Sequence, residues 1–488
     1  MHDAAADARP IDAPAAVEPA DGALTLTAIC AAGETAPSRI GVELVLPLRG
    51  RPVFRIDDSA DGDAGIVATL SDLALSDAGG AVPFGRRMSG EALEVVPRRA
   101  VRGPVTLSYR ASSLPLADHG SWWGVRHDDV SIGGAGRHFL IVPDDVAPHR
   151  VRVTWQPPAC AKAGKGYSSF PGDVAVVDSV QELLYASYFW GKGRGARATA
   201  GGGEVLGVWF GDIALDVAAA TSYAAEVYAA ERAFFGDADA SPYTVFARVI
   251  PEQHDHSNGI GQPHSFLLAI GPTLPWAAHL RTNIAHEMFH RWFGMRTSIG
   301  EGLDNAWWFS EGFTVYYANV IPFRHHLIGP DEFVANLNVA TTKHFANKYR
   351  HATNAAIRAG FASNADLQRV PYSRGALYAA ELDAAIRAAS RGKRSLDDLV
   401  VGLYRAGEPT HWKAPLKPAA FTTALERELG AAAVARFHAV IEDGATPNPP
   451  TGAYGPCFTR HELAGGAFEW ARVPGIADQD CQIDTTPR

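Results

Sequence analysis

A short pattern of two histidines and a glutamate is the part of the chain best suited to chemistry. His286, Glu287 and His290 stand together in an HExxH arrangement. On a helix, His286 and His290 lie about 40° apart around the axis and one turn apart along it, so both imidazoles can reach one metal ion. Glu287 lies about 100° from His286, close enough to take a proton from a water on that metal. This combination is typical of a zinc site with a general base.

A third ligand is available in the next apolar stretch, residues 306–320. Glu311 lies 21 positions after His290 and begins a Glu-Gly-Phe-Thr run. A carboxylate from this stretch would leave the fourth zinc position open for water, as catalytic sites require. We therefore predict one Zn²⁺ per chain, held by His286, His290 and Glu311. The alternative is a pair of buried amphipathic helices in which the histidines are only hydrogen bonded.

The segment around the two histidines has the features of a helix. Apolar residues give it one continuous face, and Thr273 or Pro275 is a plausible start,. Gly294 is a plausible stop,. We expect the helix to run between these points.

The runs HEMFHRWFG and WWFSEGFTVYY resemble those of the gluzincin metallopeptidases. The resemblance is greatest to the glycyl aminopeptidase family, whose pattern reads HExFHxWN and then LWFSEGFTxYY, and aminopeptidase N is a more distant relative. One departure is Phe293, which stands where the family has an asparagine. The resemblance implies a zinc metallopeptidase with a peptide substrate and a thermolysin-like catalytic domain.

A second motif, Val370 to Ala376, resembles the YxKG-type motif of gluzincins. The resemblance implies that the Tyr372 hydroxyl donates a hydrogen bond to the tetrahedral oxyanion, a contribution of about 2.7–4 kcal/mol at comparable sites. The alternative is a tyrosine at the start of a helix over residues 378–390 that only packs against its neighbours.

The resembled families carry a Gly-rich strand that pairs with the substrate, and its glutamate holds the substrate's amino terminus. Gly259, Gly261 and Gln262 occupy this place here, and no acidic residue occurs in the run 259–265. An amide accepts a hydrogen bond from an ammonium group but offers no charge, which weakens the case for strict aminopeptidase action. Three nearby histidines would suit either a second metal site or solvent-facing positions: His254, His256 and His264.

Short alternating apolar runs separated by Gly, Pro and Asp clusters fill the first third of the chain, and helical patterns fill the last third,. We predict a multidomain α+β protein with an amino-terminal antiparallel β domain, a thermolysin-like catalytic domain and a carboxyl-terminal helical domain. The expected boundaries are a disordered tail at 1–22, a β-rich domain at 23–165, the catalytic domain at 166–325, the helical domain at 326–442 and a tail at 443–488. Expected helices include 179–190, 217–235, 330–348, 395–404 and 418–439.

Composition excludes several classes of protein. The 488 residues carry a net charge of -9, with 47% hydrophobic and 20% charged residues. The negative balance and the lack of a basic tract argue against a nucleic-acid partner. No apolar run reaches about 18 residues, so no transmembrane segment is expected. The oligomeric state stays open.

Four cysteines bear on the compartment. Two disulfides, for example Cys30–Cys160 and Cys457–Cys481, are one option among three possible pairings, and four buried thiols are another,. The second pair would tie the tail at 443–488. Disulfides and the resemblance to exported peptidases predict a periplasmic or secreted protein. Residues 1–22 lack the apolar core of a signal peptide, so that signal is not among them,.

We predict a zinc metallopeptidase, and two alternatives remain open. One is a catalytically weak zinc- or peptide-binding protein, and the other is a hydrolase of a non-peptide bond on the same site. An intact Glu287 and Tyr372 favour an enzyme, whereas the missing acidic residue beside Gln262 favours a binding protein.

Overall fold

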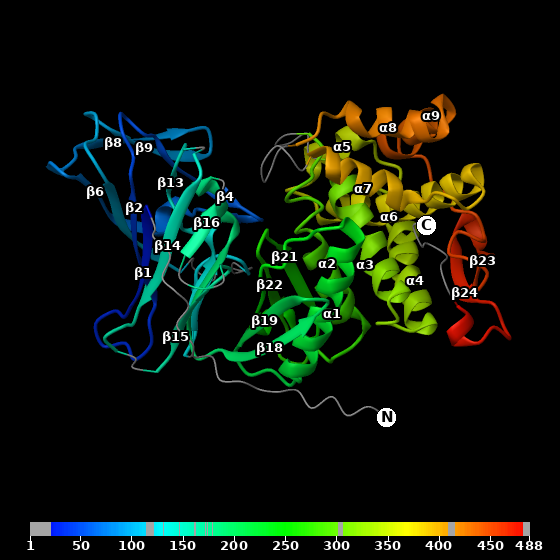
Figure 1. Ribbon diagram of the computed structural model, residues 1–488, viewed down its shortest axis with the longest axis horizontal. Helices are drawn as coiled ribbons and strands as arrows, with labels where there is room; N and C mark the ends of the chain where they lie inside the picture. The colour runs from blue at the N-terminus through cyan, green and yellow to red at the C-terminus, as the bar shows by residue number, and fades with distance from the viewer. Residues whose placement is uncertain are drawn as a thin grey trace. The chain divides into compact units, whose positions relative to one another are not determined.

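The computed structural model describes residues 21–113, 122–129, 131–145, 147–160, 163–170, 172, 174–177, 179–300, 306–407 and 415–481. Residues 1–20 of the predicted tail therefore lie outside the described residues. The chain divides into two compact units. The first comprises Met1–Ala225 and Ala240–Trp276, and the second comprises Glu226–Asp239 and Ala277–Arg488. Figure 1 labels many of the helices and strands of both units.

The largest sheet of the first unit has seven strands. Inward and outward side chains alternate along its central strands, which is the pattern of a sheet with one buried face,. All neighbouring strands are antiparallel except β1 and β14. Their order is β16 (Val174–Val177), β14 (His149–Gln156), β1 (Gly22–Ile29), β2 (Arg39–Leu46), β10 (Val105–Ser112), β6 (Leu70–Asp77) and β7 (Gly80–Ala81).

Smaller sheets complete the β-rich part of this unit. One has the order β13 (Val142–Pro143), β3 (Phe54–Asp57), β9 (Ala92–Pro97) and β8 (Phe84–Ser89). Another has the order β11 (Arg126–His127), β12 (Ser131–Ala135), β17 (Ser187–Gly191) and β15 (Lys165–Ser168). A two-stranded ribbon joins β4 (Ser59–Ala60) to β5 (Asp63–Ala64). The predicted amino-terminal antiparallel sheets are confirmed.

A five-stranded mixed sheet follows in the chain. Its order is β18 (Arg194–Ala200), β19 (Gly203–Phe210), β20 (Tyr243–Val249), β22 (Ser265–Ile270) and β21 (Ser257–Gly261). β19, β20 and β22 are parallel, and every residue of β22 is buried. A continuous apolar run is what a strand covered on both faces requires. β21 pairs antiparallel with β22 and forms one edge of the sheet.

The expected helix over 179–190 is wrong. Residues Val180–Tyr185 form 3₁₀ turns, opened by the Ser179 hydroxyl oxygen, which accepts a hydrogen bond from the Gln181 N–H. The chain then enters β17, whose five residues are all buried. Consecutive aromatic residues fit a strand between two neighbours better than one face of a helix.

The second unit is mainly helical. The carboxyl-terminal half of α1 (Val217–Phe235) belongs to it, and the next helix is α2 (Ala278–Phe289). A π-helical segment, η6 (Trp308–Phe313), leads directly into α3 (Thr314–Arg324). The remaining helices are α4 (Pro330–Ala346), α5 (Asn354–Gly360), α6 (Ala365–Ser390), α7 (Leu396–Gly407), α8 (Ala419–Leu429) and α9 (Ala431–Phe437), which continues into a π-helical turn at His438–Glu442. The hairpin of β23 (Phe458–Glu462) and β24 (Phe468–Arg472) ends the fold.

Two helix boundaries differ from expectation. α6 begins at Ala365, because the Asn364 side chain accepts hydrogen bonds from the N–H groups of the first turn. Tyr372 therefore lies inside a helix and not at its start. The expected helix over 418–439 is broken at Gly430, whose φ of +82° favours glycine,.

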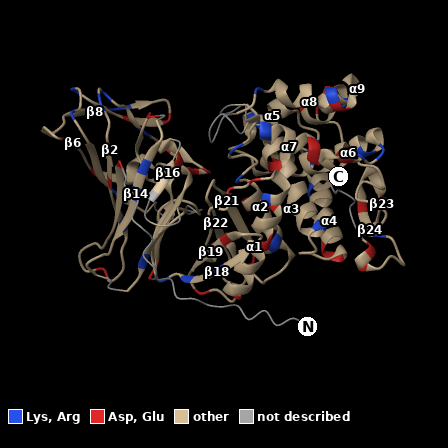
Figure 2. Cartoon of the chain, viewed as in Figure 1, with Lys and Arg blue, Asp and Glu red and all other residues tan. Residues whose placement is uncertain are grey.

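The sulfur atoms of Cys30 and Cys160 are paired, and so are those of Cys457 and Cys481, as one of the sequence-based options had it. Acidic and basic residues are interspersed along the elements of both units (Figure 2). Among the described residues, no helix combines the length and apolar character that a bilayer crossing needs.

Candidate active site

α2 presents the HExxH pattern from a buried helix. It begins at Ala278, later than expected, because the N–H groups of Thr273 and Leu274 donate outside the helix, to the carbonyls of His254 and Gly271. It ends at Phe289, and His290 caps its carboxyl end. One face is fully buried and consists of Leu280, Ile284, Ala285, Met288 and Phe289.

The three predicted metal ligands converge on one point. His286 Nε2 and His290 Nε2 are 3.2 Å apart. Glu311 Oε2 lies 3.3 Å from His286 Nε2 and 3.4 Å from His290 Nε2. Atoms bound to one tetrahedral zinc at its usual bond lengths stand about 3.3–3.5 Å apart. The donor set and its spacing therefore fit Zn²⁺ without rearrangement.

The charge balance at this point also suits a cation site. Burial opposes a charge on His290, but the Glu311 carboxylate and then Glu287 outweigh it and raise the pKa of His290 to about 9. Burial likewise opposes a charge on Glu311, but His290 and His286 outweigh it and hold the pKa of Glu311 well below its usual value. The Glu311 carboxylate and Glu287 thus make the surroundings of His290 favourable to a positive charge.

Glu287 and Tyr372 flank the ligands. Burial, followed by the negative charges of Glu311 and Glu287, raises the pKa of Tyr372 well above its usual value. The Tyr372 hydroxyl is hydrogen bonded to Glu311, and its ring is 6.2 Å from the His286 ring. The structure therefore brings together all five residues predicted for metal binding and catalysis.

Close packing of η6 against α6 places Glu311 beside Tyr372. A Cβ on Gly312 would lie 2.5 Å from the Gly375 Cα, and a Cβ on Gly375 would lie 2.3 Å from the Trp308 carbonyl oxygen. Real Cβ atoms do not approach backbone atoms this closely. The two backbones can touch only because both positions are glycines.

The predicted substrate residues belong to the first unit. Gly259 and Gly261 lie on β21, and Gln262 follows it. The Gln262 side chain is buried, and its Oε1 accepts hydrogen bonds from Ser187 Oγ at 3.0 Å and Ser265 Oγ at 2.6 Å. This oxygen is therefore already engaged within the protein.

The histidines near Gln262 have other neighbours. His256 Nδ1 is 2.6 Å from an Asp255 carboxylate oxygen, and His264 Nε2 is 3.5 Å from a Glu182 carboxylate oxygen. Within the described ranges, the only cluster of three possible metal ligands is the one containing Glu311.

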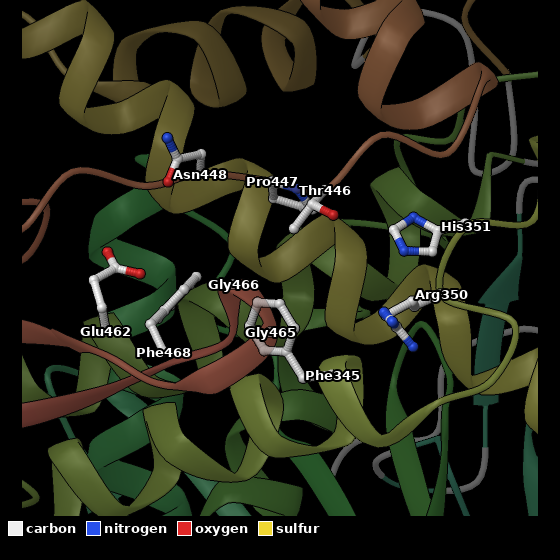
Figure 3. Close-up of a pocket in the computed structure, with 10 residues that line it drawn as sticks. All are labelled: Phe345, Arg350, His351, Thr446, Pro447, Asn448, Glu462, Gly465, Gly466 and Phe468. Atoms are coloured by element: carbon white, nitrogen blue, oxygen red, sulfur yellow. The ribbon is translucent and has the colours of Figure 1, made fainter.

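A separate surface pocket of about 350 Å³ lies in the second unit (Figure 3). Its lining includes Phe345, Arg350, His351 and Phe468 and none of the predicted metal or catalytic residues. It is therefore no part of the HExxH site.

Residues 279–378 match the family model of the M61 glycyl aminopeptidases. This segment contains the three metal-ligand candidates, Glu287 and Tyr372. Over these residues the chain is similar to the M61 glycyl aminopeptidases. The gluzincin recognition made from the two sequence runs is confirmed, and the matched family is one of peptidases.

Solved structures share the fold of this chain. An aminopeptidase N family protein from Idiomarina loihiensis has 15% identity and a TM-score of 0.72 over 90% of this chain and 79% of its own. An M1 zinc metallopeptidase from Deinococcus radiodurans has 16% identity and a TM-score of 0.56 over 88% and 95%. Yeast LTA4 hydrolase in complex with bestatin has 13% identity and a TM-score of 0.54 over 90% and 72%. A search of curated proteins finds no match. The predicted multidomain α+β class is confirmed.

Sequence reasoning missed two sets of residues in and around the segment that matches the family model. The contact between Gly312 and Gly375 could have been predicted, because Gly312 lies in the run WWFSEGFTVYY and Gly375 lies in the Val370 to Ala376 motif. Two aspartates after α1, Asp237 and Asp239, contact side chains beyond α2. They are about fifty positions away in sequence, and no local pattern connects them.

Proposed function

We propose that this chain is a zinc-dependent, aminopeptidase-like metallopeptidase with one Zn²⁺ held by His286, His290 and Glu311. The observation that carries the proposal is the set of three ligand-to-ligand distances, each between 3.2 and 3.4 Å. The adjacent Glu287 distinguishes a hydrolytic site from a purely structural one, because a structural zinc has four protein ligands and no base.

The chain's own residues would divide the reaction between them. Zinc, when bound, would lower the pKa of a water and polarise the scissile carbonyl. Glu287 accepts the proton of the attacking water as the new C–O bond forms, and gives that proton to the leaving nitrogen as the C–N bond breaks. The Tyr372 hydroxyl donates a hydrogen bond to the oxyanion that develops on the carbonyl oxygen.

The position of β21, the last strand of its sheet in the described part of the chain, supports a binding mode for the peptide. Edge strands present unpaired backbone groups, and an added peptide strand gains hydrogen bonds that do not depend on its side chains. Gly259 and Gly261 carry no Cβ and allow close approach. We propose that the substrate backbone lies along Gly259 to Ser265.

Two disulfides support a periplasmic or secreted location, because thiols stay reduced in the cytosol. Mass analysis under non-reducing conditions, on protein taken from its native compartment, tests this. Four free thiols would count against the proposal.

Metal analysis with a peptide-library assay tests the proposed function. We expect about one zinc per chain, loss of peptide hydrolysis on chelation and its return with added zinc. Purified protein without zinc, and without uptake after refilling, would refute the metal site. Zinc without peptide turnover would favour a zinc- or peptide-binding protein. Turnover restricted to a non-peptide substrate would favour a hydrolase of a non-peptide bond.

A further inference from the structure

The turn after α2, residues 290–297, orients one of the metal-ligand candidates. His290 Nδ1 lies 3.0 Å from the Phe293 carbonyl oxygen. This contact places the ring proton on Nδ1, which leaves the Nε2 lone pair for a metal. The Thr297 N–H donates to the Trp292 carbonyl and closes the turn. The direction of His290 Nε2 therefore depends on where this turn is held.

Side chains from the same turn converge on two aspartates. Trp292 Nε1 donates to Asp237 Oδ2 at 2.7 Å, and Arg296 Nη1 is 3.5 Å from that oxygen. Arg291 Nη2 donates to Asp239 Oδ2 at 2.7 Å, and Arg291 Nε is 3.8 Å from Asp237 Oδ2. We call these five residues the aspartate clasp. It joins the turn to the segment that follows α1.

The contacts among Asp237, Arg291 and Trp292 are buried and therefore little weakened by solvent, whereas Arg296 and Asp239 are 28% and 37% exposed. Arg291 and Trp292 are 0% exposed, and the Asp237 side chain is 5% exposed. The Arg291 guanidinium lies 5.8 Å from the centre of the Tyr228 ring, and the Trp292 ring stacks on Phe235 at 5.3 Å. Removing one partner of a buried charge group leaves the others uncompensated, so the remaining side chains must move.

We propose that Asp237 is a positioning residue for His290. Its carboxylate holds Trp292, Arg291 and Arg296 of this turn together, and the Phe293 carbonyl of the same turn orients the imidazole. This inference rests on the proposed function, since it concerns the zinc affinity that His290 contributes as a ligand. Loss of residues that orient a metal-ligating histidine costs about 10–100-fold in metal affinity.

Two variants test the clasp in the full chain. Asp237→Asn keeps an oxygen that can accept from Trp292 but removes the charge between the arginines. Trp292→Phe keeps a stacking ring but removes the Nε1–H donor. We expect both to raise the zinc dissociation constant, about 10–100-fold for Asp237→Asn, measured by competition with a chromophoric chelator. The thermal midpoint of the metal-free protein is measured in parallel.

Glu381→Gln is the matched control. Glu381 accepts hydrogen bonds from Arg436 at 2.6 and 2.9 Å, in the same unit but on α6. It should lower the thermal midpoint as Asp237→Asn does, without changing the zinc dissociation constant. Wild-type zinc affinity in Trp292→Phe, or in a folded Asp237→Asn, would show that Asp237 does not position His290. It would leave the proposed zinc site itself unaffected. Wild-type protein that binds no zinc would instead overturn the proposed function.

Discussion

At the scale of single residues, Glu287 carries the largest expected effect. Glu287→Gln keeps the size and shape of the side chain, but an amide cannot accept the proton of the attacking water. We expect zinc content to stay at the wild-type level and kcat to fall by about 10²–10⁴-fold or more. Metal analysis and peptide kinetics on the same preparation check this. A kcat within a few-fold of wild type would assign the base to another residue.

The metal ligands could be predicted from the sequence, whereas the residues that hold them in place could not. His286 and His290 are four apart on one helix, so sequence spacing fixes their geometry. Glu311 carried a recognisable run of neighbours. Asp237 approaches Trp292 only through the folding of α1 against the turn after α2. Such a tertiary contact leaves no period or motif in the sequence of one chain.

At the scale of elements, the distance between η6 and α6 sets the distance between Glu311 and Tyr372. Gly375→Ala would place a methyl group 2.3 Å from the Trp308 carbonyl oxygen, so α6 must move away. We expect a stability loss of about 1–3 kcal/mol. We also expect a fall in kcat that approaches the effect of Tyr372→Phe, because both changes weaken the same hydrogen bond to the oxyanion. Peptide kinetics with denaturant unfolding measure both.

Gly402→Ala is the control for this prediction. Gly402 lies in α7, and a Cβ there would meet nothing within 4 Å. Alanine should stabilise this helix by about 0.5–1 kcal/mol and leave kcat unchanged. Equal kinetics for Gly375→Ala and Gly402→Ala would contradict the importance of the close contact.

Element types were predictable where the local period was strong. The alternating run 105–109 became β10, and the apolar stripe at 217–235 became α1 with the expected ends. The predicted element boundaries were wrong where a capping side chain or the pairing with neighbouring strands determines the structure. The Asn364 cap starts α6 earlier than its apolar period indicated. The aromatic residues of β17 were assigned to a helix, because only their neighbours β12 and β15 make them a strand.

At the scale of the whole chain, each disulfide closes a loop within one unit. Cys457 and Cys481 are 24 positions apart and enclose the β23–β24 hairpin. Replacing both by serine removes the constraint on the unfolded chain, and we expect the free energy of unfolding to fall by about 3–4 kcal/mol. Urea unfolding of the oxidised protein and the double variant measures this. Coincident unfolding curves would show that the bond is dispensable.

The demand for a free amino terminus depends on whether the chain supplies a negative charge beside the substrate strand. Gln262 supplies none, and its Oε1 is held by Ser187 and Ser265. We therefore expect free and acetylated forms of one good peptide to differ in kcat/KM by less than about 100-fold, which corresponds to roughly 2.7 kcal/mol. Gln262→Glu would put a carboxylate in the same place and should raise the preference for the free form. A larger preference in the wild type, unchanged in Gln262→Ala, would show that another carboxylate anchors the substrate ammonium.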